Sequence, residues 1–509
     1  MVDTLSASPQ GLAIADQARR RLGWTKTSTA RWWQDAHTSR ATLRRFWRGE
    51  NIQQEAFIAI CKAVGITDWS QIAADSVTAG ATDPAPVGET PPLVDWDEAP
   101  DLNAFCGRSQ ELQHLETLIL SDRQRFIAIT GLAGVGKTAL ALACADRLQE
   151  KFAGVIWRSL WHHASLADLL DSLLTAFGEP PPPDQRSVAP LSAHLKRHRY
   201  LIVLDGLDNA LDSEVLDGVA ARDTWQAWAN LSRLSQMNYQ SCILTTSREP
   251  PPLANLPPAA QMPLTGLSQA DGETLLATLG LTGSFAERSA LSRIYGGNPL
   301  AMLLAVPVIQ SLFGGHLGQF LQQKALFVGD RLRTLLDQQL AHLTPLEKAI
   351  AYWLAIWQEP IALSRLQSHL LPTPDPLRVL ECLVNLEGRS LLSKCFIEDE
   401  PAFTLHPLVM ECVIAQVVQI VGAEIEQILD SQDIGKMQVL RTHCLVRPGT
   451  DDVAGDRLLR QIQGNLCQRY GVKVGDRLWD LQTLLQGHAS VTLGYAGYNL
   501  TELGRAWMD

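Results

Sequence analysis

The chain of 509 residues is long enough for three or four domains. Its composition, with 46% hydrophobic and 19% charged residues, is that of an ordinary globular protein. Its net charge of −11 excludes a general electrostatic affinity for nucleic acid or for an anionic membrane. No apolar run is expected to span a bilayer, the amino terminus does not resemble a signal peptide, and the nine cysteines form no C-x-x-C pair, which together favour a cytoplasmic protein.

Residues 1–75 are predicted to form a small all-helical domain that is more basic than the rest of the chain. The segment 17–50 holds nine lysines and arginines against two acids. The third of its four predicted helices begins after Ser39, a good N-cap residue, and ends before Gly49, a common helix terminator. Three arginines lie along one face of this helix, namely Arg40, Arg44 and Arg48.

The same domain resembles the Cro/repressor-like helix-turn-helix family. The resemblance is carried by the pattern Ser39, Thr42, Leu43, Phe46, Gly49 and Ile52, followed by Phe57, Ile60, Ala63, Gly65 and Ile66. It implies a recognition helix in a DNA groove, with DNA contacted through residues 28–50. The open alternative is a helical adaptor that binds a protein through the same segment. Trp32 and Trp33 bear on this choice, because two adjacent tryptophans cannot both face one core and one of them would then anchor a partner.

Residues 76–104 are predicted to be a flexible linker. Four prolines interrupt any regular structure there, namely Pro84, Pro86, Pro91 and Pro92. Alanine, glycine, threonine and acidic residues fill the rest, which is typical of a loose tether. From about residue 105 strand-like apolar runs alternate with helical segments, so a parallel α/β sheet is expected over residues 105–265.

The strongest motif of the chain is Gly131–Thr138, with the sequence GLAGVGKT. It follows the apolar run Phe126–Thr130 and precedes a predicted helix, which is the strand–turn–helix context of a P-loop. Lys137 is expected to reach the β- and γ-phosphates of a nucleotide, and the Thr138 hydroxyl to bind Mg²⁺. The backbone groups expected to surround the phosphates belong to Gly131, Gly134, Gly136 and Ala139.

Two further apolar runs end in polar residues, as strands do at the carboxyl edge of a nucleotide-binding sheet. The run Tyr200–Asp205 makes its final aspartate the expected Mg²⁺ partner of Thr138, although an aspartate at this place can also cap the next helix. The run Cys242–Arg248 ends in a cation that could sense the γ-phosphate, with a solvated arginine as the alternative. The candidate catalytic residues of a P-loop NTPase are therefore Lys137, Asp205 and Arg248.

After the sheet the chain is predicted to be almost wholly helical. A helical domain is expected over residues 266–334 and a winged-helix domain over residues 335–418, with Ser390–Ile397 and Ala402–Leu405 as the strands of the wing. A helical segment, 419–509, is expected to follow. The predicted fold class is thus multidomain: a P-loop parallel α/β sheet, followed by helical and winged-helix domains and preceded by a small helix-turn-helix domain.

Residues from about 105 to 415 resemble the NB-ARC module of STAND-class signalling NTPases. Six motifs of that module occur in order, at Phe105–Arg108, Gly131–Thr138, Leu201–Asp205, Leu244–Arg248, Gly297–Ala301 and Leu405–Pro407. The resemblance implies ATP or ADP with Mg²⁺ as cofactors, with Gly107 and Arg108 on the adenine side of the nucleotide. It also implies that Pro299 abuts the adenine and that His406 contacts the β-phosphate of ADP.

Two departures from the module concern hydrolysis and the closed state. Gly206 stands where the family often has a second acid, which implies slow hydrolysis, and Pro407 stands where an aspartate usually follows the histidine.

The leading hypothesis is a signalling switch that is closed with ADP and open and self-associating with ATP. The alternatives are a transcriptional regulator whose helix-turn-helix binds DNA under nucleotide control, and a plain ATPase. The chain is also similar to cyanobacterial-type NB-ARC proteins, in which a repeat array follows a segment such as Tyr495–Leu503.

Overall fold

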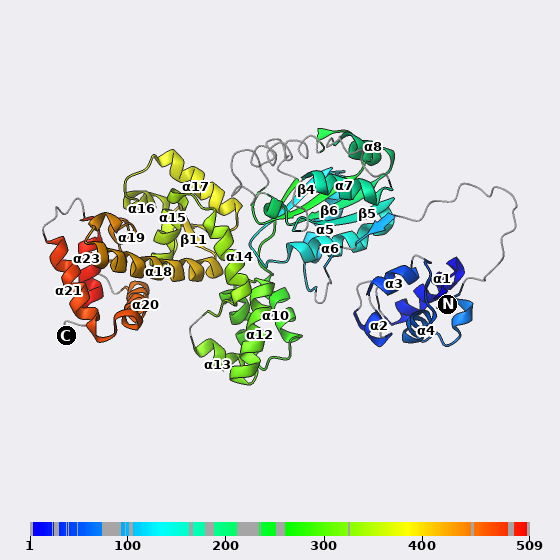
Figure 1. Cartoon of the computed structure of the whole chain (residues 1–509), viewed down its shortest axis with the longest axis horizontal. Coiled ribbons are helices and arrows are strands. Elements are labelled where there is room, and N and C mark those ends of the chain that lie inside the picture. The colour runs from blue at the N-terminus through cyan, green and yellow to red at the C-terminus, as the bar shows by residue number, and fades with distance from the viewer. Residues whose placement is uncertain are drawn as a thin grey trace. The chain divides into compact units, whose positions relative to one another are not determined.

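The computed structural model of the chain describes most of its residues. These are residues 4–22, 24, 30–36, 38, 40–47, 49–73, 93–96, 98–100, 105–161, 166–178, 188–210, 234, 236–250, 260–323, 326–448, 452–486 and 493–505. They form two compact units, one made of Met1–Leu93 with Asp97–Phe105 and the other of Val94–Trp96 with Cys106–Asp509. Among the described residues, the first unit is helical apart from one short strand pair, and the second holds the central sheet (Figure 1).

The first unit is a bundle of the four helices that the sequence predicts. Their bounds are α1 (Pro9–Arg21), α2 (Ala30–Asp35), α3 (Arg40–Trp47) and α4 (Gln54–Ala63). Leu43 and Phe46 of α3 are fully buried, as the apolar face of this helix predicts. Trp32 is also fully buried and donates its indole N–H to the carbonyl oxygen of Ile60 at 3.1 Å, whereas Trp33 is half-buried. One tryptophan of the adjacent pair thus belongs to the core.

A strand pair that the sequence analysis did not predict completes this unit. Strand β1 (Thr4–Leu5) pairs antiparallel with β2 (Ile52–Gln53), immediately before α4. The side chains of Arg40 and Arg44, and Arg48 as a whole, lie outside the described residues. The basic face of α3 and its role in binding DNA or protein therefore stay predictions.

The second unit is built on a six-stranded sheet in the order β3-β5-β6-β7-β4-β8. Its strands are β3 (Leu93–Asp95), β4 (Phe126–Thr130), β5 (Gly154–Ser159), β6 (Tyr200–Asp205), β7 (Cys242–Ser247) and β8 (Gln261–Pro263). The pairing is parallel from β5 through β6, β7 and β4 to β8. The helices that cover its two faces are α5 (Ser109–Glu116) with α6 (Lys137–Leu148), and α7 (Leu166–Ala176) with α8 (Ala189–Arg197) (Figure 1). Because both faces are covered, the central strands are buried throughout, and each has an apolar run that ends in polar residues.

The edge strand β3 lies inside the expected linker and corrects its extent. Asp95 forms an ion pair with Arg158 of β5 at 2.7 Å, and Trp96 stacks on Trp157 with ring centroids 6.5 Å apart. The linker is therefore shorter at its carboxyl end than predicted, and its proline-rich part, 74–92, lies outside the described residues. A three-residue strand carries too little periodicity to be seen in the sequence, and the same holds for β8 at the opposite edge.

The rest of the second unit is mainly helical, as predicted. Its helices are α10 (Gln269–Ala277), α11 (Phe285–Ile294), α12 (Pro299–Phe313), α13 (Leu317–Gln322), α14 (Asp330–Ala341), α15 (Pro345–Trp357), α16 (Leu363–His369), α17 (Pro376–Gly388), α18 (Pro407–Ser431), α19 (Val439–Thr442), α20 (Val453–Tyr470), α21 (Val474–Leu485) and α23 (Ala496–Gly504). Ser284 with Glu287 and Thr344 with Glu347 form capping boxes that start α11 and α15. The two domain boundaries expected in this part of the chain fall inside α14 and α18. One buried apolar cluster contains side chains from α10 through α23, so the helices cross those boundaries without leaving the core.

The two strands expected for a wing are present as a hairpin. Strand β10 (Leu392–Ile397) pairs antiparallel with β11 (Glu400–Leu405), whose other edge pairs with the short β9 (Ile361–Ala362). Glu398 and Asp399 form the connecting turn with φ of 48° and 65°, the conformation that a two-residue hairpin turn requires. The hairpin joins α17 to α18. The winged-helix interpretation of this region stays a prediction.

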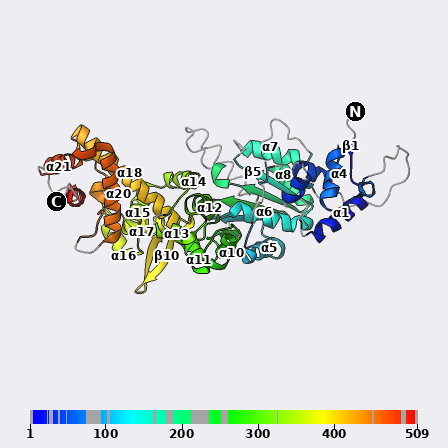
Figure 2. The same cartoon turned by 90° about the horizontal axis from the view of Figure 1, so that it is seen from below.

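Helix α18 departs from the expectation that no apolar segment is long enough to cross a bilayer. By length and composition alone its 25 residues meet that criterion. Inside the protein, however, 61% of its most apolar stretch is buried. Side chains such as Val417, Val421 and Ile425 lie in the core, where α18 packs against α15 and α20 (Figure 2). The apolar character of this helix is thus used in packing.

Candidate nucleotide-binding site

The P-loop lies between strand β4 and helix α6 and owes its shape to three glycines. Gly131, Gly134 and Gly136 have φ of 151°, 77° and 103°, a region that other residues rarely adopt. The loop is also closely packed. A Cβ atom at Gly131 would stand 2.5 Å from the carbonyl oxygen of Leu264, and one at Gly134 would stand 2.8 Å from the Cβ atom of Leu300. The glycine spacing of the motif is therefore required both by the turn and by its packing.

Lys137 is the first residue of α6 and is only 9% exposed. Its ammonium group donates to the carbonyl oxygens of Gly131 at 2.9 Å and Leu132 at 3.1 Å, so it lies within the loop that would surround a phosphate. Burial lowers the pKa of Lys137 to about 8. Ala139 lies in the first turn of the same helix, whose unpaired N–H groups favour a bound anion.

The structure brings Thr138 and Asp205 together at the carboxyl edge of the sheet. The Thr138 hydroxyl donates to Asp205 Oδ1 at 2.8 Å, and the Thr246 hydroxyl donates to the same oxygen at 2.6 Å. Burial raises the pKa of Asp205, and the two hydroxyl hydrogen bonds oppose that shift. A hydroxyl and a carboxylate are the oxygen ligands that Mg²⁺ prefers, so Thr138 and Asp205 fit a magnesium site.

Thr246 is a residue of this site that the sequence analysis did not single out. Strand β7 lies between β4, which leads into the P-loop, and β6, which ends in Asp205. A polar residue near the end of β7 therefore falls between the two. The Thr246 hydroxyl also accepts the backbone N–H of Gly206 at 2.9 Å. The available signal was the pair of threonines in a buried strand that begins with three apolar residues.

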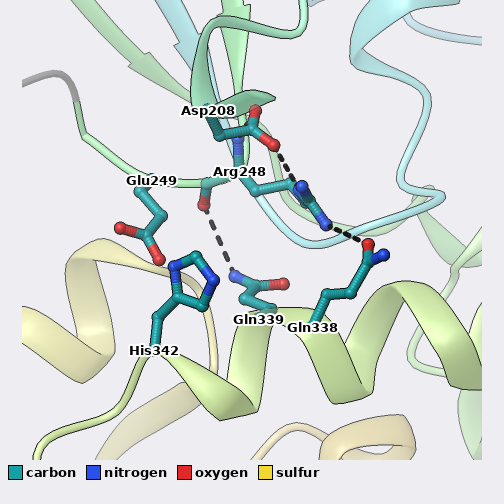
Figure 3. A pocket seen from close by; sticks show the side chains of 6 residues that line it. All are labelled: Asp208, Arg248, Glu249, Gln338, Gln339 and His342. Carbon is teal, nitrogen blue, oxygen red and sulfur yellow. Dashed lines mark hydrogen bonds and ion pairs between the residues drawn. The ribbon is translucent and has the colours of Figure 1, made fainter. Parts of the chain in front are cut away.

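Arg248 follows β7 and is only 8% exposed, so it is not the solvated arginine that the sequence leaves open. Asp208 accepts its backbone N–H at 2.8 Å and forms an ion pair with its guanidinium Nε. The guanidinium Nη1 donates to the carbonyl oxygen of Leu335 at 3.4 Å and to Gln338 Oε1 at 3.3 Å, both in α14. Figure 3 shows Asp208, Arg248 and Gln338 among the residues that line a small cavity. Arg248 thus connects the end of the sheet with the helical part of the unit.

The turn before α12 lies directly on the P-loop. Asn298 is 1% exposed, caps α12 through its side-chain oxygen, and donates its side-chain amide to the carbonyl oxygen of Ala133 at 2.9 Å. Pro299 follows as the first helical residue, and a Cβ atom at Gly136 would stand 3.8 Å from its Cγ atom. The structure therefore places Pro299 beside the phosphate loop. Asn298 is a further residue of this site that was not predicted, although an asparagine before a proline is a strong signal for a helix start.

His406 reaches the site through the same turn. Its Nδ1 accepts the backbone N–H of Leu408 at 3.3 Å and so caps α18. Its ring also hydrogen-bonds to the backbone of Gly296, and a Cβ atom at that glycine would stand 2.3 Å from His406 Nε2. Burial lowers the pKa of His406 to about 4. The imidazole is therefore neutral near pH 7, and because Nδ1 accepts, its proton is on Nε2.

Arg108 contacts the P-loop through its guanidinium group. It has a φ of 65°, is 4% exposed and directly precedes α5. Its guanidinium donates to the carbonyl oxygens of Thr265 at 2.7 Å and Val135 at 3.2 Å, and pairs with Glu111 at 2.7 Å. Gly107 precedes it with a φ of 69°. These contacts support the loop, and the adenine contact implied for Gly107 and Arg108 stays a prediction.

A mainly parallel sheet with a P-loop between strand and helix, and an acid at the end of a nearby strand, defines a P-loop NTPase domain. Residues 120–246 match the family model of the AAA domain, so this domain is of the AAA type. P-loop ATPases bind ATP or ADP, usually with Mg²⁺. The residues assembled here fit both a nucleotide phosphate and the metal ion.

Two curated relatives extend the comparison beyond this domain. An uncharacterised WD repeat-containing protein of Nostoc sp. is 32% identical over 580 residues, covering 99% of this chain and 46% of the relative. A candidate disease resistance protein of Arabidopsis thaliana is 29% identical over 146 residues, covering 26% of this chain and 13% of the relative. The chain thus spans less than half the length of these relatives.

Solved structures give more distant likenesses. The ORC2 protein of Aeropyrum pernix is 17% identical, with 64% of this chain and 98% of that chain covered at a TM-score of 0.40. A STAND protein of Pyrococcus horikoshii with a tetratricopeptide repeat sensor is 15% identical, with 80% of this chain and 59% of that chain covered at a TM-score of 0.30.

Proposed function

We propose that the chain is a nucleotide-operated signalling switch of the NB-ARC type with slow ATP hydrolysis. ADP stabilises a closed arrangement of the sheet and the helices that follow it, and ATP with Mg²⁺ favours an open, self-associating one. The observation that carries the proposal is that the turn before α12 is bonded to the P-loop on one side and to the start of α18 on the other.

The contact with the P-loop is made by main-chain and side-chain groups together. Asn298 donates to the carbonyl oxygen of Ala133, and the backbone N–H of Leu300 donates to that of Gly134 at 3.3 Å. Leu132 and Ala133 belong to the same buried apolar cluster as helices α10 to α23. A change in the P-loop on nucleotide exchange therefore acts directly on the helical part.

The contact with α18 is made by His406. In this chain its ring bonds to Gly296, two residues before Asn298, and both of its ring nitrogens are used by backbone groups. The histidine thus supports the nucleotide site through the turn. This role needs no aspartate directly after the histidine. Pro407 can therefore occupy that position as the first residue of α18.

A nucleotide shifts such an equilibrium only by as much as its affinities for the two states differ. ADP and ATP differ by the γ-phosphate, so the discriminating groups lie where that phosphate would bind. Lys137 and Arg248 supply positive charge there. Thr138 and Asp205 would hold Mg²⁺, which neutralises part of the phosphate charge.

Slow hydrolysis follows from the residues after Asp205. Gly206 carries no carboxylate, so the position directly after Asp205 offers no acid to orient an attacking water. Turnover is expected well below the 1–10³ per second of typical enzymes, so nucleotide exchange rather than hydrolysis carries the signal.

The test is to identify the nucleotide carried by the purified chain and to measure its mass by light scattering with ADP and with ATP and Mg²⁺. We expect bound ADP, a monomer with ADP and a larger species with ATP. Lys137→Ala is the control that removes the phosphate contact and should show one mass in both nucleotides. A wild-type chain that carries no nucleotide and keeps one mass in both would overturn the proposal.

A further inference from the structure

Asp208 binds two groups of Arg248, its backbone N–H and its guanidinium. Gly206, with a φ of 80°, redirects the chain after β6, and the one-turn 3-10 helix at Leu207–Ala210 places Asp208 beside the end of β7. Asp208 Oδ1 accepts the backbone N–H of Arg248 at 2.8 Å, and Oδ2 pairs with the guanidinium Nε. A buried carboxylate that binds both the main chain and the side chain of one residue fixes the direction of that side chain.

The direction so fixed is toward helix α14. The guanidinium Nη1 donates to the carbonyl oxygen of Leu335. It also donates to Gln338 Oε1, and the carbonyl oxygen of Arg248 accepts the amide of Gln339 at 3.5 Å (Figure 3). Gln339 also donates to the carbonyl oxygen of Arg389 at 3.0 Å, at the end of α17. Three hydrogen bonds of Arg248 thus join the sheet to α14.

The same ion pair lies within electrostatic reach of the phosphate site. Burial is the main cause of the low pKa of Lys137, and the next largest are the charges of Asp208, which opposes the shift, and Arg248, which adds to it. A γ-phosphate bound beside Lys137 would act on both charged groups, attracting Arg248 and repelling Asp208.

We propose that Asp208 is a positioning residue that keeps Arg248 on α14 while ADP is bound, and that the γ-phosphate of ATP competes with Asp208 for the same guanidinium. The inference deepens the switch proposed above and rests on it. When Arg248 changes partner, its hydrogen bonds to Leu335 and Gln338 are lost, and α14 is released from the end of the sheet. The strength of the ion pair therefore sets the preference for ADP over ATP.

The alternative role for Asp208 is to support ATP binding. If it held Arg248 in the orientation that binds the γ-phosphate, its loss would weaken ATP binding as the loss of Arg248 does. The two roles predict opposite changes in the ratio of ATP affinity to ADP affinity, so this ratio decides between them.

The experiment measures that ratio by calorimetry with Mg²⁺ in the full chain, for wild type and for Asp208→Asn, Gln338→Leu and Arg248→Ala. We expect Asp208→Asn to raise the ATP preference on the order of tenfold, a common size for allosteric coupling. Gln338→Leu, which leaves no charge unpaired, should raise it less but in the same direction, and Arg248→Ala should lower it. Light scattering should show that the first two variants self-associate at lower ATP concentrations.

Asp452→Asn is the matched control, because Asp452 is a buried partner of another arginine, Arg447, at 3.0 Å and is assigned no part in the nucleotide site. It should keep the wild-type ratio. An unchanged or lowered ATP preference in Asp208→Asn overturns the inference, and if that variant does not fold, Gln338→Leu decides alone. If wild type binds no nucleotide, the switch itself fails; if wild type responds to ATP but neither variant shifts the ratio, only the role of Asp208 fails.

Discussion

The side-chain amide of Asn298 donates a 2.9 Å hydrogen bond to the carbonyl oxygen of Ala133, and so joins the start of α12 to the P-loop. The oxygen of the same side chain accepts the backbone N–H of Ala301 at 3.1 Å. Because Asn298 is 1% exposed, water cannot readily replace either bond. One residue therefore both starts the helix and holds the phosphate loop.

Replacing Asn298 by alanine is expected to weaken nucleotide binding and to lower thermal stability. The substitution leaves the Ala133 carbonyl without this partner, at a cost of about 1–3 kcal/mol, and removes a helix cap worth about 1 kcal/mol. Ser284→Ala is the control, since it removes the cap of α11 without touching the P-loop. Calorimetry with ADP and a thermal melt separate the effects. Equal loss of ADP affinity in both variants would mean that stability alone is responsible.

Lys137 is expected to make nucleotide affinity depend on pH. Its pKa of about 8 in the free protein means that above this pH the ammonium is largely neutral, and binding a phosphate must then take up a proton. Affinity should therefore fall as the pH rises through 8. Calorimetry at pH 8.5 in two buffers of different ionisation enthalpy measures the uptake. Lys137→Ala should abolish binding, and wild-type ADP affinity in that variant would refute the P-loop assignment.

Asp205→Asn is expected to spare nucleotide binding more than the dependence on Mg²⁺. The neutral amide still accepts the hydroxyls of Thr138 and Thr246, but the metal loses its anionic partner. Titrating Mg²⁺ into the ATP-bound variant, with mass as the readout, should show that the shift to the larger species needs more metal. An unchanged Mg²⁺ requirement would show that Asp205 is not the metal-binding acid.

How much of this arrangement the sequence predicts depends on the distance over which each signal extends. The P-loop and the strand that ends in Asp205 are local patterns, and they are found where expected. The bond from Asn298 to Ala133 spans 165 residues, and the pair of Asp208 with Arg248 spans 40. No pattern of neighbours encodes such contacts. The sequence could name Arg248 and His406 as site residues, but not that their partners are Asp208 and Gly296.

The edge strand β3 illustrates the same limit. Its three residues follow a proline-rich stretch, and what holds them is Arg158, 63 residues further along the chain. The domain boundaries expected after residues 334 and 418 fall inside α14 and α18, and one buried core contains side chains from both helices. Packing over long range, rather than local propensity, decides both cases.

His406→Ala is expected to speed the release of ADP and to shift the chain toward the self-associating state. The variant loses the contact with Gly296 as well as the cap of α18. His406→Asn separates the two, because asparagine is a good N-cap residue but its side chain is too short to reach as far as an imidazole. Both variants should release ADP faster, with only the alanine variant less stable. Tighter ADP binding in either would refute the role given to His406.

The last prediction concerns Arg40, Arg44 and Arg48, whose side chains lie outside the described residues. The first unit has its own buried core, so a fragment of residues 1–75 can be studied alone. If the basic face of α3 enters a DNA groove, the fragment should bind duplex DNA weakly, with an affinity that falls steeply as salt rises, because phosphate contacts release counterions.

Replacing all three arginines by alanine should then cost about 1–3 kcal/mol per base-contacting residue and flatten the plot of log affinity against log salt. Replacing Lys62, a basic residue in the last turn of α4, is the matched control and should leave both nearly unchanged. Fluorescence anisotropy with random duplex DNA across a salt series measures both quantities. A flat anisotropy signal at low salt would favour the adaptor role, in which the same segment binds a protein.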